Sequence, residues 1–248
     1  MEWKEYSERL KKVLGLKGSP VAVTYTMRPP QGAPQAKSWV CRALLSARDG
    51  KTYCISKETS SCAGGTWHLG LGPKPTGDAD KALKKFLVHG EKLFCSYATF
   101  YRCMSQTSEP PLNLADYVIF CPLEEAQEKP DLVVFICNPG QACRLLTLAM
   151  YQTGIPPRAE LAGSACHMAV AYPIVSGEIN ISFWDYTARR IQKLDENRLS
   201  VSVPYHYMKD IVESIEGCSA GTASIEGFQR MLRAMQPTGG AEEAPTGE

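Results

Sequence analysis

Hydrophobic residues recur along the chain with two different periods, and segments of the two kinds alternate. Trp3, Tyr6, Leu10 and Leu14 are three or four residues apart, which predicts an amphipathic first helix that ends at Gly15. Short apolar runs predict buried strands, at residues 21–25, 51–55, 117–121, 132–137, 179–184 and 199–203. Helix-forming and strand-forming segments therefore follow one another through most of the sequence.

The remaining helices are predicted from their start signals. Pro139 stands in the first turn of one helix, and Asp78 is a suitable N-cap for another. Helices are predicted at residues 39–47, 78–88, 97–106, 138–152, 204–215 and 224–235. The proline-rich segment 28–37 and the glycine-rich segment 70–77 are predicted to be loops.

This alternation predicts a layered α/β fold, with α+β as the alternative. The strands are short and some connections are long, which favours a compact mixed sheet with flanking helices. Residues 1–220 are predicted to form a single globular domain, and residues 221–236 a C-terminal helix. Residues 237–248 consist only of Pro, Thr, Gly, Ala and Glu, so a disordered tail is predicted there.

Two segments of the chain resemble each other, at about residues 16–75 and 130–175. In each, a hydrophobic strand precedes a helix that contains Cys-Arg, and a second cysteine follows a turn of small residues. The matched pairs are Cys41 with Cys143 and Cys62 with Cys166. An internal duplication would place Cys62 and Cys166 at equivalent points that face a shared cleft. Chance similarity between two ordinary strand–helix units is the alternative.

Composition and charge exclude several classes of function. The chain has 248 residues, of which 44% are hydrophobic and 21% charged, and its net charge is +1. This balance gives no overall attraction to nucleic acid or to an acidic membrane surface. The apolar runs are shorter than the about 20 residues of a membrane span, and the charged N-terminus lacks the apolar core of a signal peptide. A cytoplasmic protein that binds neither nucleic acid nor a membrane is expected.

Cysteine is the residue type that stands out. Ten cysteines occur, at positions 41, 54, 62, 95, 103, 121, 137, 143, 166 and 218. Thiols stay reduced in a cytoplasm, so a disulfide framework is not expected. No two cysteines are separated by two residues, which leaves zinc ribbons, thioredoxin-type motifs and compact ferredoxin motifs unsupported. Cys121 and Cys137 lie inside apolar runs and are interpreted as small buried hydrophobic residues.

Residues 60–65, of sequence SSCAGG, give the strongest local signal for chemistry. Small residues let a ligand approach the backbone, and free N–H groups at the start of a helix bind anions. A cysteine in such a first turn has its thiolate favoured, which suits a nucleophile, a metal ligand or a cluster ligand. Cys62 is therefore the leading candidate, with Ser61, Gly64 and Gly65 beside the ligand. Tight helix packing that needs the two glycines is the alternative.

Two other segments carry reactive groups. The sequence GSACH places Cys166 beside His167, and a histidine can activate a thiol or share a metal with it. Arg42 follows Cys41 and offers a planar fork for a carboxylate or phosphate. A structural histidine and a surface arginine are the alternative interpretations of these side chains.

The remaining motifs are weaker or missing. Cys54 lies on a predicted strand just before a turn, so its thiol can converge with that of Cys62. Arg189 and Arg190 follow a predicted strand and are candidates for binding an anion, with a solvated pair as the alternative. The sequence contains no phosphate-binding loop, dinucleotide-binding glycine motif, zinc-protease helix or serine-nucleophile elbow.

Several segments together resemble a known family. They are EYSERLKKVLGLKGSPVAV, SCAGGTWHLGL, PLEEAQEKPDLVVFICNPGQACRLL and VSVPYHYMKDIVESIE. In this order they resemble an uncharacterised prokaryotic family named domain of unknown function 169, over about residues 1–216. Members are common in archaea and anaerobic bacteria, which agrees with reduced thiols, but the resemblance implies no reaction. The stretch 184–190 departs from the family pattern, which weakens an anion-binding role for Arg189 and Arg190.

The favoured hypothesis is a cysteine-rich redox protein that binds an iron–sulfur cluster or another thiolate-ligated metal. Thiolates suit soft metals and iron–sulfur clusters, and the excess of cysteine fits this chemistry. The fold would have to bring together ligands that lie far apart in the sequence. The expected ligands are Cys41, Cys54, Cys62 and Cys166. A redox protein or a small molecule would be the partner, and a homo-oligomer is a further option.

Two alternatives use the same region differently. In the first, the chain is an enzyme that acts on a small anionic metabolite, with Cys62 as the nucleophile and His167 or His68 as the base. In the second, the chain is a non-catalytic module that binds a small anion. Arg42, Ser61, Gly64 and Gly65 would then line the binding site.

Overall fold

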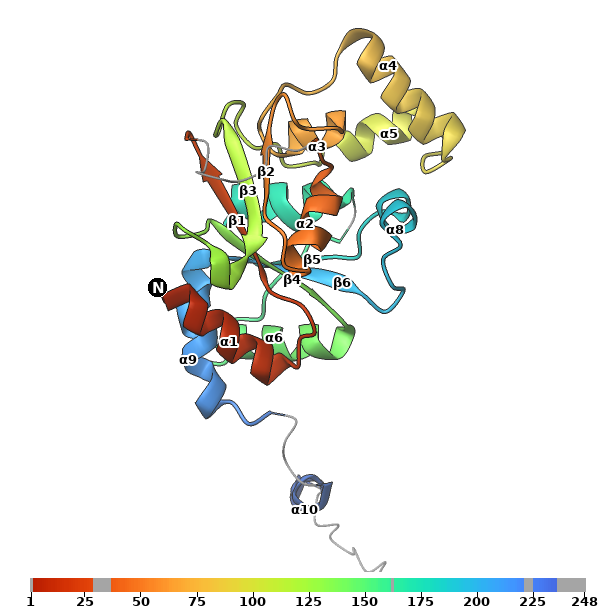
Figure 1. Cartoon of the computed structure of the whole chain (residues 1–248). Coiled ribbons are helices and arrows are strands. Elements are labelled where there is room, and N and C mark those ends of the chain that lie inside the picture. Colours follow the sequence, from red (N-terminus) through yellow and green to blue (C-terminus); the bar gives the residue numbers. More distant parts are fainter. Residues whose placement is uncertain (1, 29–36, 162, 221–224, 236–248) are drawn as a thin grey trace, which may run out of the picture.

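A single six-stranded β-sheet forms the centre of the computed structural model, which describes residues 2–28, 37–161, 163–220 and 225–235. Helices pack against both faces of the sheet (Figure 1). The strands are β1 (Val21–Thr26), β2 (Tyr53–Ser56), β3 (Tyr117–Pro122), β4 (Leu132–Cys137), β5 (Asn180–Ser182) and β6 (Leu199–Pro204). Across the sheet they run in the order β2-β3-β1-β4-β6-β5, and neighbouring strands are antiparallel.

The central strands form where continuous apolar runs predict them, because both of their faces are covered. Every residue of β4 is buried. Val133 and Phe135 belong to one hydrophobic core, whereas Val134 and Ile136 belong to the core on the opposite face. A strand that alternates between two apolar cores has no polar positions, which explains the uninterrupted run at residues 132–137.

Three helices cover one face of the sheet: α1 (Glu2–Leu14), α6 (Pro139–Met150) and α9 (Met208–Gly217). Leu10 of α1, Leu145 of α6 and Ile211 of α9 are buried in the core between these helices and the strands. This face carries α6, and with it Cys143, which is exposed.

The opposite face is covered by α2 (Val40–Arg48), η3 (His167–Ala171), α7 (Tyr172–Ser176) and α8 (Tyr186–Gln192). Leu44 of α2, Val170 of η3 and Ala188 of α8 lie in the same core. The short helix α3 (Ala63–His68) packs against η3. Most of the predicted site residues therefore belong to this face.

The remaining helices lie outside these two layers. Figure 1 shows α4 (Gly77–Lys85) and α5 (Tyr97–Met104) away from the sheet, and the Lys84 ammonium joins them by donating a hydrogen bond to Tyr101 Oη at 2.7 Å. The others are η1 (Phe86–Gly90), η2 (Leu123–Glu125), η4 (Tyr205–Tyr207) and α10 (Ile225–Met235). Of the helices in the described ranges, none has both the length and the apolar character needed to span a membrane.

The predicted α/β class is confirmed, and each predicted strand corresponds to a strand of the sheet. The sheet is antiparallel throughout rather than mixed. β1 and β2 run in the same direction but β3 lies between them, and β6 separates β4 from β5 in the same way. The helix predicted from residue 78 begins one residue earlier, with Thr76 rather than Asp78 at its N-cap.

The strand order is the same in both halves of the sheet, read outward from its centre. In one half the order is β1, β3, β2, and in the other it is β4, β6, β5. In each half the chain leaves the central strand, reaches the outermost strand through a helical connection, and returns through a second helical connection to the strand between them; α6 is an additional helix between β4 and β5, and α4, η1 and α5 are additional helices between β2 and β3. The duplication inferred from the sequence stays a prediction, but this order is the one that a duplicated unit would produce.

The two halves match different residues from those that the sequence comparison paired. Among the helices on the α2 face of the sheet, η3 and α7 stand between β4 and β5 as α2 stands between β1 and β2, and α8 follows β5 as α3 follows β2. The predicted counterpart of α2, which is α6, lies on the other face because its apolar side packs with α1 and α9. Cys41 and Cys143 are therefore on opposite sides of the sheet.

The structure describes part of the predicted repeat halves, C-terminal helix and tail. Both predicted halves, 16–75 and 130–175, contribute strands to the one sheet. Of the predicted helix at 221–236, the structure describes 225–235, which form α10. The predicted tail at 237–248 lies outside the described residues.

Candidate thiol site

Three of the predicted cysteines lie near one another at the starts of three helices. Cys41 is the second residue of α2, Cys62 is the N-cap of α3, and Cys166 directly precedes η3. The pKa of Cys41 is raised to about 11 and that of Cys166 to about 12, mainly by burial and in smaller part by negative charge at Cys62. The fold thus brings into electrostatic contact three thiols that are far apart in the sequence.

Cys62 is the exposed member of this group. Its Sγ accepts a hydrogen bond from the Gly65 N–H, with 3.4 Å between nitrogen and sulfur, so the cysteine caps α3 as a serine would. A Cβ atom on Gly65 would lie 3.1 Å from Val40 Cγ2, so this glycine is needed for close packing of α3 on α2. A Cβ on Gly64 would meet only Cys62 Sγ, at 3.9 Å. The packing interpretation therefore fits Gly65, whereas Gly64 leaves room beside the thiol.

Two hydrogen bonds join the segment before α3 to the segment before α2. The Ser61 N–H donates to the Ser38 carbonyl at 3.0 Å, and Trp39 Nε1 donates to the Ser61 carbonyl at 3.2 Å. Ser61 thus acts through its main chain, and its bonds hold the helix starts that carry Cys41 and Cys62 together.

A carboxylate that the sequence analysis did not single out completes the group. Asp185 is the N-cap of α8, and its Oδ1 accepts a hydrogen bond from the Ala188 N–H at 2.7 Å. Its Oδ2 accepts a second bond, from the Ala165 N–H at 2.9 Å, which ties α8 to the helical turn that contains Cys166. After burial, the Asp185 charge is one of the causes that raise the pKa of Cys41 and of Cys166.

The residue before Asp185 has a strained backbone. Trp184 has φ of +64°, a left-handed conformation that bulky residues rarely adopt. Its indole is buried, and Nε1 donates a hydrogen bond to Ser200 Oγ of β6 at 3.0 Å. The buried indole thus holds the turn that presents Asp185, and strain of this kind is concentrated at functional sites.

The four groups follow the same approximate twofold arrangement as the strands. Cys41 lies in the first turn of α2, between β1 and β2, and Cys166 lies in the helical turn that opens η3, between β4 and β5. Cys62 and Asp185 each cap the helix that follows the outermost strand, and each accepts a hydrogen bond from the third residue of that helix. Asp185 therefore occupies the place that corresponds to Cys62.

The fourth predicted ligand, Cys54, lies elsewhere. It is fully buried in β2, where its neighbour Ile55 packs in the core on the α2 face. Successive side chains of a strand point to opposite faces, so the Cys54 thiol faces away from α2. Burial alone raises its pKa to about 11, without a contribution from the other thiols.

A family model described as "Uncharacterised ArCR" and named DUF169 matches residues 9–214. The chain belongs to the DUF169 family. The matched range contains Cys41, Cys62, Cys166 and Asp185, and the resemblance found in the sequence is confirmed.

The comparison with individual proteins adds one relative, and no solved structure matches the chain. An uncharacterized protein of Methanocaldococcus jannaschii, MJ0308, is 32% identical over 100 residues. The aligned part is 40% of this chain and 43% of that protein, so the match spans less than half of each. The family and the relative are both described as uncharacterised, and neither description assigns a reaction.

The two candidate histidines of this DUF169 protein, His68 and His167, pack on each other. The rings of His68 and His167 have centroids 5.1 Å apart, and Trp67 stacks on His68 at 4.3 Å. Burial lowers the pKa of His68 to about 3 and that of His167 to about 4, so both rings are neutral near pH 7. Within the described ranges, the one hydrogen bond that Cys62 Sγ makes is with Gly65, so neither histidine is placed to take its proton directly.

The arginines beside the cysteines have different surroundings. Arg144, which follows Cys143, donates hydrogen bonds to the Cys218 carbonyl at 2.6 Å and to its Sγ at 3.3 Å, and so anchors the end of α9. Arg42 is exposed and lines a groove between α2 and α8. Gly64 and Gly65, with which Arg42 was expected to line one site, are not among the residues that line this groove.

The remaining cysteines divide between the core and the surface. Cys121 and Cys137 are buried in β3 and β4 as predicted, and burial raises the pKa of each to about 12. Cys95 is exposed and forms a hydrogen bond with Thr99 Oγ1 at 3.5 Å, which lowers its pKa.

Proposed function

We propose that this DUF169 protein binds an iron–sulfur cluster through Cys41, Cys62 and Cys166 and uses it to transfer electrons. The observation that carries the proposal is the meeting of three thiols from three helix starts at one place in the fold. Thiolates are the usual ligands of iron–sulfur clusters. The proposal includes a cytoplasmic location, where thiols stay reduced, and a redox protein or small molecule as electron partner.

We propose a cluster rather than a single metal ion. The sulfur ligands of one tetrahedral zinc ion lie within about 4 Å of one another, given bonds of about 2.3 Å. In the part of the chain that the structure describes, no group of three His, Cys, Asp or Glu side chains is arranged to hold one ion. A cluster places several iron atoms between its ligands, so its thiolates stand farther apart than those of a single ion.

Three thiolates leave one position of a four-ligand cluster without a cysteine. Asp185 is the nearest acidic candidate, but both of its oxygens already accept backbone hydrogen bonds, at 2.7 and 2.9 Å. We therefore assign Asp185 the role of positioning Cys166. The fourth position would be available to an external ligand on the exposed side, where Cys62 lies.

A second candidate function is a cysteine-dependent enzyme that acts on a small anionic metabolite. It is favoured by the exposure of Cys62 and by its place at the start of α3, where it receives the Gly65 N–H. The two functions differ in which thiols they need. A nucleophile needs Cys62 alone, whereas a cluster also needs Cys41 and Cys166.

The test is the iron and acid-labile sulfide content of the full chain purified without oxygen, together with its visible spectrum. The proposal predicts a brown protein with about four irons and four sulfides per chain. Cys41→Ala, Cys62→Ala and Cys166→Ala should each lose most of the iron and the colour.

Cys143→Ala is the matched control, because it removes an exposed cysteine on the opposite face of the sheet. It should keep the iron content of the parent protein. A colourless parent protein that stays free of iron after reconstitution with iron and sulfide would overturn the proposal. Labelling of Cys62 by a haloacetamide that a metabolite blocks, in a protein free of iron, would support the enzyme instead.

A further inference from the structure

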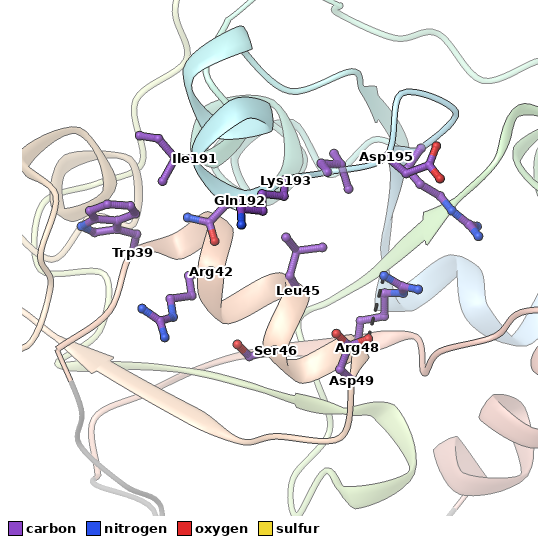
Figure 2. Close-up of a pocket in the computed structure, with 12 residues that line it drawn as sticks. Trp39, Arg42, Leu45, Ser46, Arg48, Asp49, Ile191, Gln192, Lys193 and Asp195 are labelled. Atoms are coloured by element: carbon purple, nitrogen blue, oxygen red, sulfur yellow. Dashed lines mark ion pairs between the residues drawn. The ribbon is translucent and has the colours of Figure 1, made fainter.

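We propose that the groove between α2 and α8 binds a flat organic anion that carries a phosphate or two carboxylates. The groove has a volume of about 700 Å³, which lies within the range of small-molecule sites. Figure 2 shows Trp39 at one end, Leu45 between the two helices, and Arg48 and Asp195 at the other end. The inference goes beyond the cluster proposal and does not depend on it.

The charge of the groove favours an anion. Four cationic side chains line it, Arg42, Arg48, Lys193 and Arg198, against two acidic ones, Asp49 and Asp195. This excess of two positive charges is concentrated in one groove of a chain whose total net charge is only +1. Such a groove attracts anionic ligands and raises their local concentration.

The acidic side chains of the groove are already engaged, whereas two of the cations are free to bind. Asp49 lies 3.8 Å from Arg48, and Asp195 accepts a hydrogen bond from the Asn197 N–H at 2.7 Å. Arg42 and Lys193 have no ion-pair partner within the described part of the chain, and both are exposed. They are the two groups that we assign to the anion.

The backbone conformation at Lys193 is unfavourable for a lysine. Lys193 follows the last residue of α8 with φ of +50°, a left-handed conformation in which glycine or asparagine is usual. A lysine at this point stabilises the helix end less than a glycine would. Its side chain lines the groove, so a role in binding accounts for a residue that the backbone does not favour.

The loop after α8, at residues 193–198, is hydrogen-bonded to Arg189. Its Nη1 donates hydrogen bonds to the carbonyls of Phe183 and Arg198 at 2.7 and 2.9 Å. Its Nη2 donates to the carbonyls of Asp195 and Glu196 at 2.9 and 3.1 Å. Arg189 is therefore a positioning residue that builds one wall of the groove and not itself a ligand for the anion.

The apolar part of the groove defines the rest of the ligand. Trp39, Leu45, Ile191 and Leu194 contribute apolar surface. Trp39 is 37% exposed, and its indole is fixed by the hydrogen bond from Nε1 to Ser61. A fixed, partly exposed indole offers a face on which a flat ring can stack. A flat apolar body with a charged group at one end would use both parts of the groove.

Calorimetric titration of the full chain, free of metal, tests this inference with three probes. Adenosine monophosphate and naphthalene dicarboxylate are flat dianions, and adenosine is a flat neutral molecule. At least one dianion should bind and adenosine should not, and the binding should weaken as salt is added.

Two variants and one control identify the groove as the site. Lys193→Gly and Arg42→Gln should each weaken binding of the dianion by about tenfold, the loss of one charge-assisted hydrogen bond. Lys193→Gly also relieves the left-handed backbone, so it should fold at least as stably as the parent. Lys12→Gln removes an exposed cation of α1 and should bind as the parent does.

The inference is overturned if neither dianion binds, or if Lys12→Gln weakens binding as much as the two groove variants. The Cys62→Ala variant separates it from the cluster proposal. That variant should lose iron and keep the anion affinity, so failure of one proposal leaves a distinct result for the other.

Discussion

At the scale of single residues, burial keeps two of the three site thiols protonated. The pKa of Cys41 is about 11 and that of Cys166 about 12, so both are poor nucleophiles at neutral pH. A metal centre removes this obstacle because it binds the thiolate and releases the proton. These two half-buried thiols are therefore better suited to ligate a metal than to react with a substrate.

The raised pKa values of Cys41 and Cys166 and the lowered pKa of Cys95 predict the order in which these three cysteines react in the metal-free protein. The thiolate fraction of Cys41 and Cys166 rises about tenfold for each unit of pH between 8 and 10, since their pKa values lie above that range. Cys95, whose pKa is lowered by its hydrogen bond with Thr99, should react first at pH 8 and gain less as the pH rises.

Brief treatment with iodoacetamide and mass spectrometry of the peptides measures these rates. At pH 8, Cys95 should be modified at least about tenfold faster than Cys41 or Cys166. Equal rates for the three cysteines at pH 8 would contradict the assigned burial of the two site thiols.

The sequence could predict the three cysteines of the site, but it could not predict that Cys54 lies outside it. Cys62 was indicated by the small residues around it, and Cys54 by its closeness to the same turn. A shift of one residue along a strand moves a side chain to the other face, and Cys54 lies on the wrong face. Asp185 is a common N-cap, so its role depends on the contact with Ala165, twenty residues away.

At the scale of elements, the site is built from helix starts that hydrogen bonds hold together. Ser61 joins the starts of α2 and α3, and Asp185 joins α8 to the turn before η3. Periodicity predicted the long helices, because they have one apolar face. The short elements η3 and α8 give little periodic signal, and the loop after α8 depends on Arg189, which lies outside it, as well as on its own hydrogen bonds.

The two adjacent arginines of α8 therefore differ in their contribution to stability. Arg189→Ala removes hydrogen bonds to four carbonyls and should lower the free energy of unfolding by about 2 kcal/mol. Arg190 is exposed, and Arg190→Ala should change it by less than about 0.5 kcal/mol.

Urea unfolding of the two variants and the parent, followed by circular dichroism, gives this comparison. The two alanine variants make a matched pair, since they differ by one position on the same helix. Equal unfolding midpoints for the two would show that the loop after α8 does not depend on Arg189.

At the scale of the whole molecule, the two halves of the sheet meet between β1 and β4, and the site draws two helix starts from each half. Cys41 and Cys62 come from the half with β1, whereas Cys166 and Asp185 come from the half with β4. A site divided in this way is complete only in the folded chain. It also explains why local motifs in the sequence did not define it.

Diffraction at the iron absorption edge tests the central claim most directly. Crystals would be grown without oxygen from the full chain purified with its iron. The account predicts one strong anomalous peak per chain, within bonding distance of the Sγ atoms of Cys41, Cys62 and Cys166. Iron bound at other residues, or these three thiols far apart with no anomalous peak between them in iron-containing crystals, would contradict it.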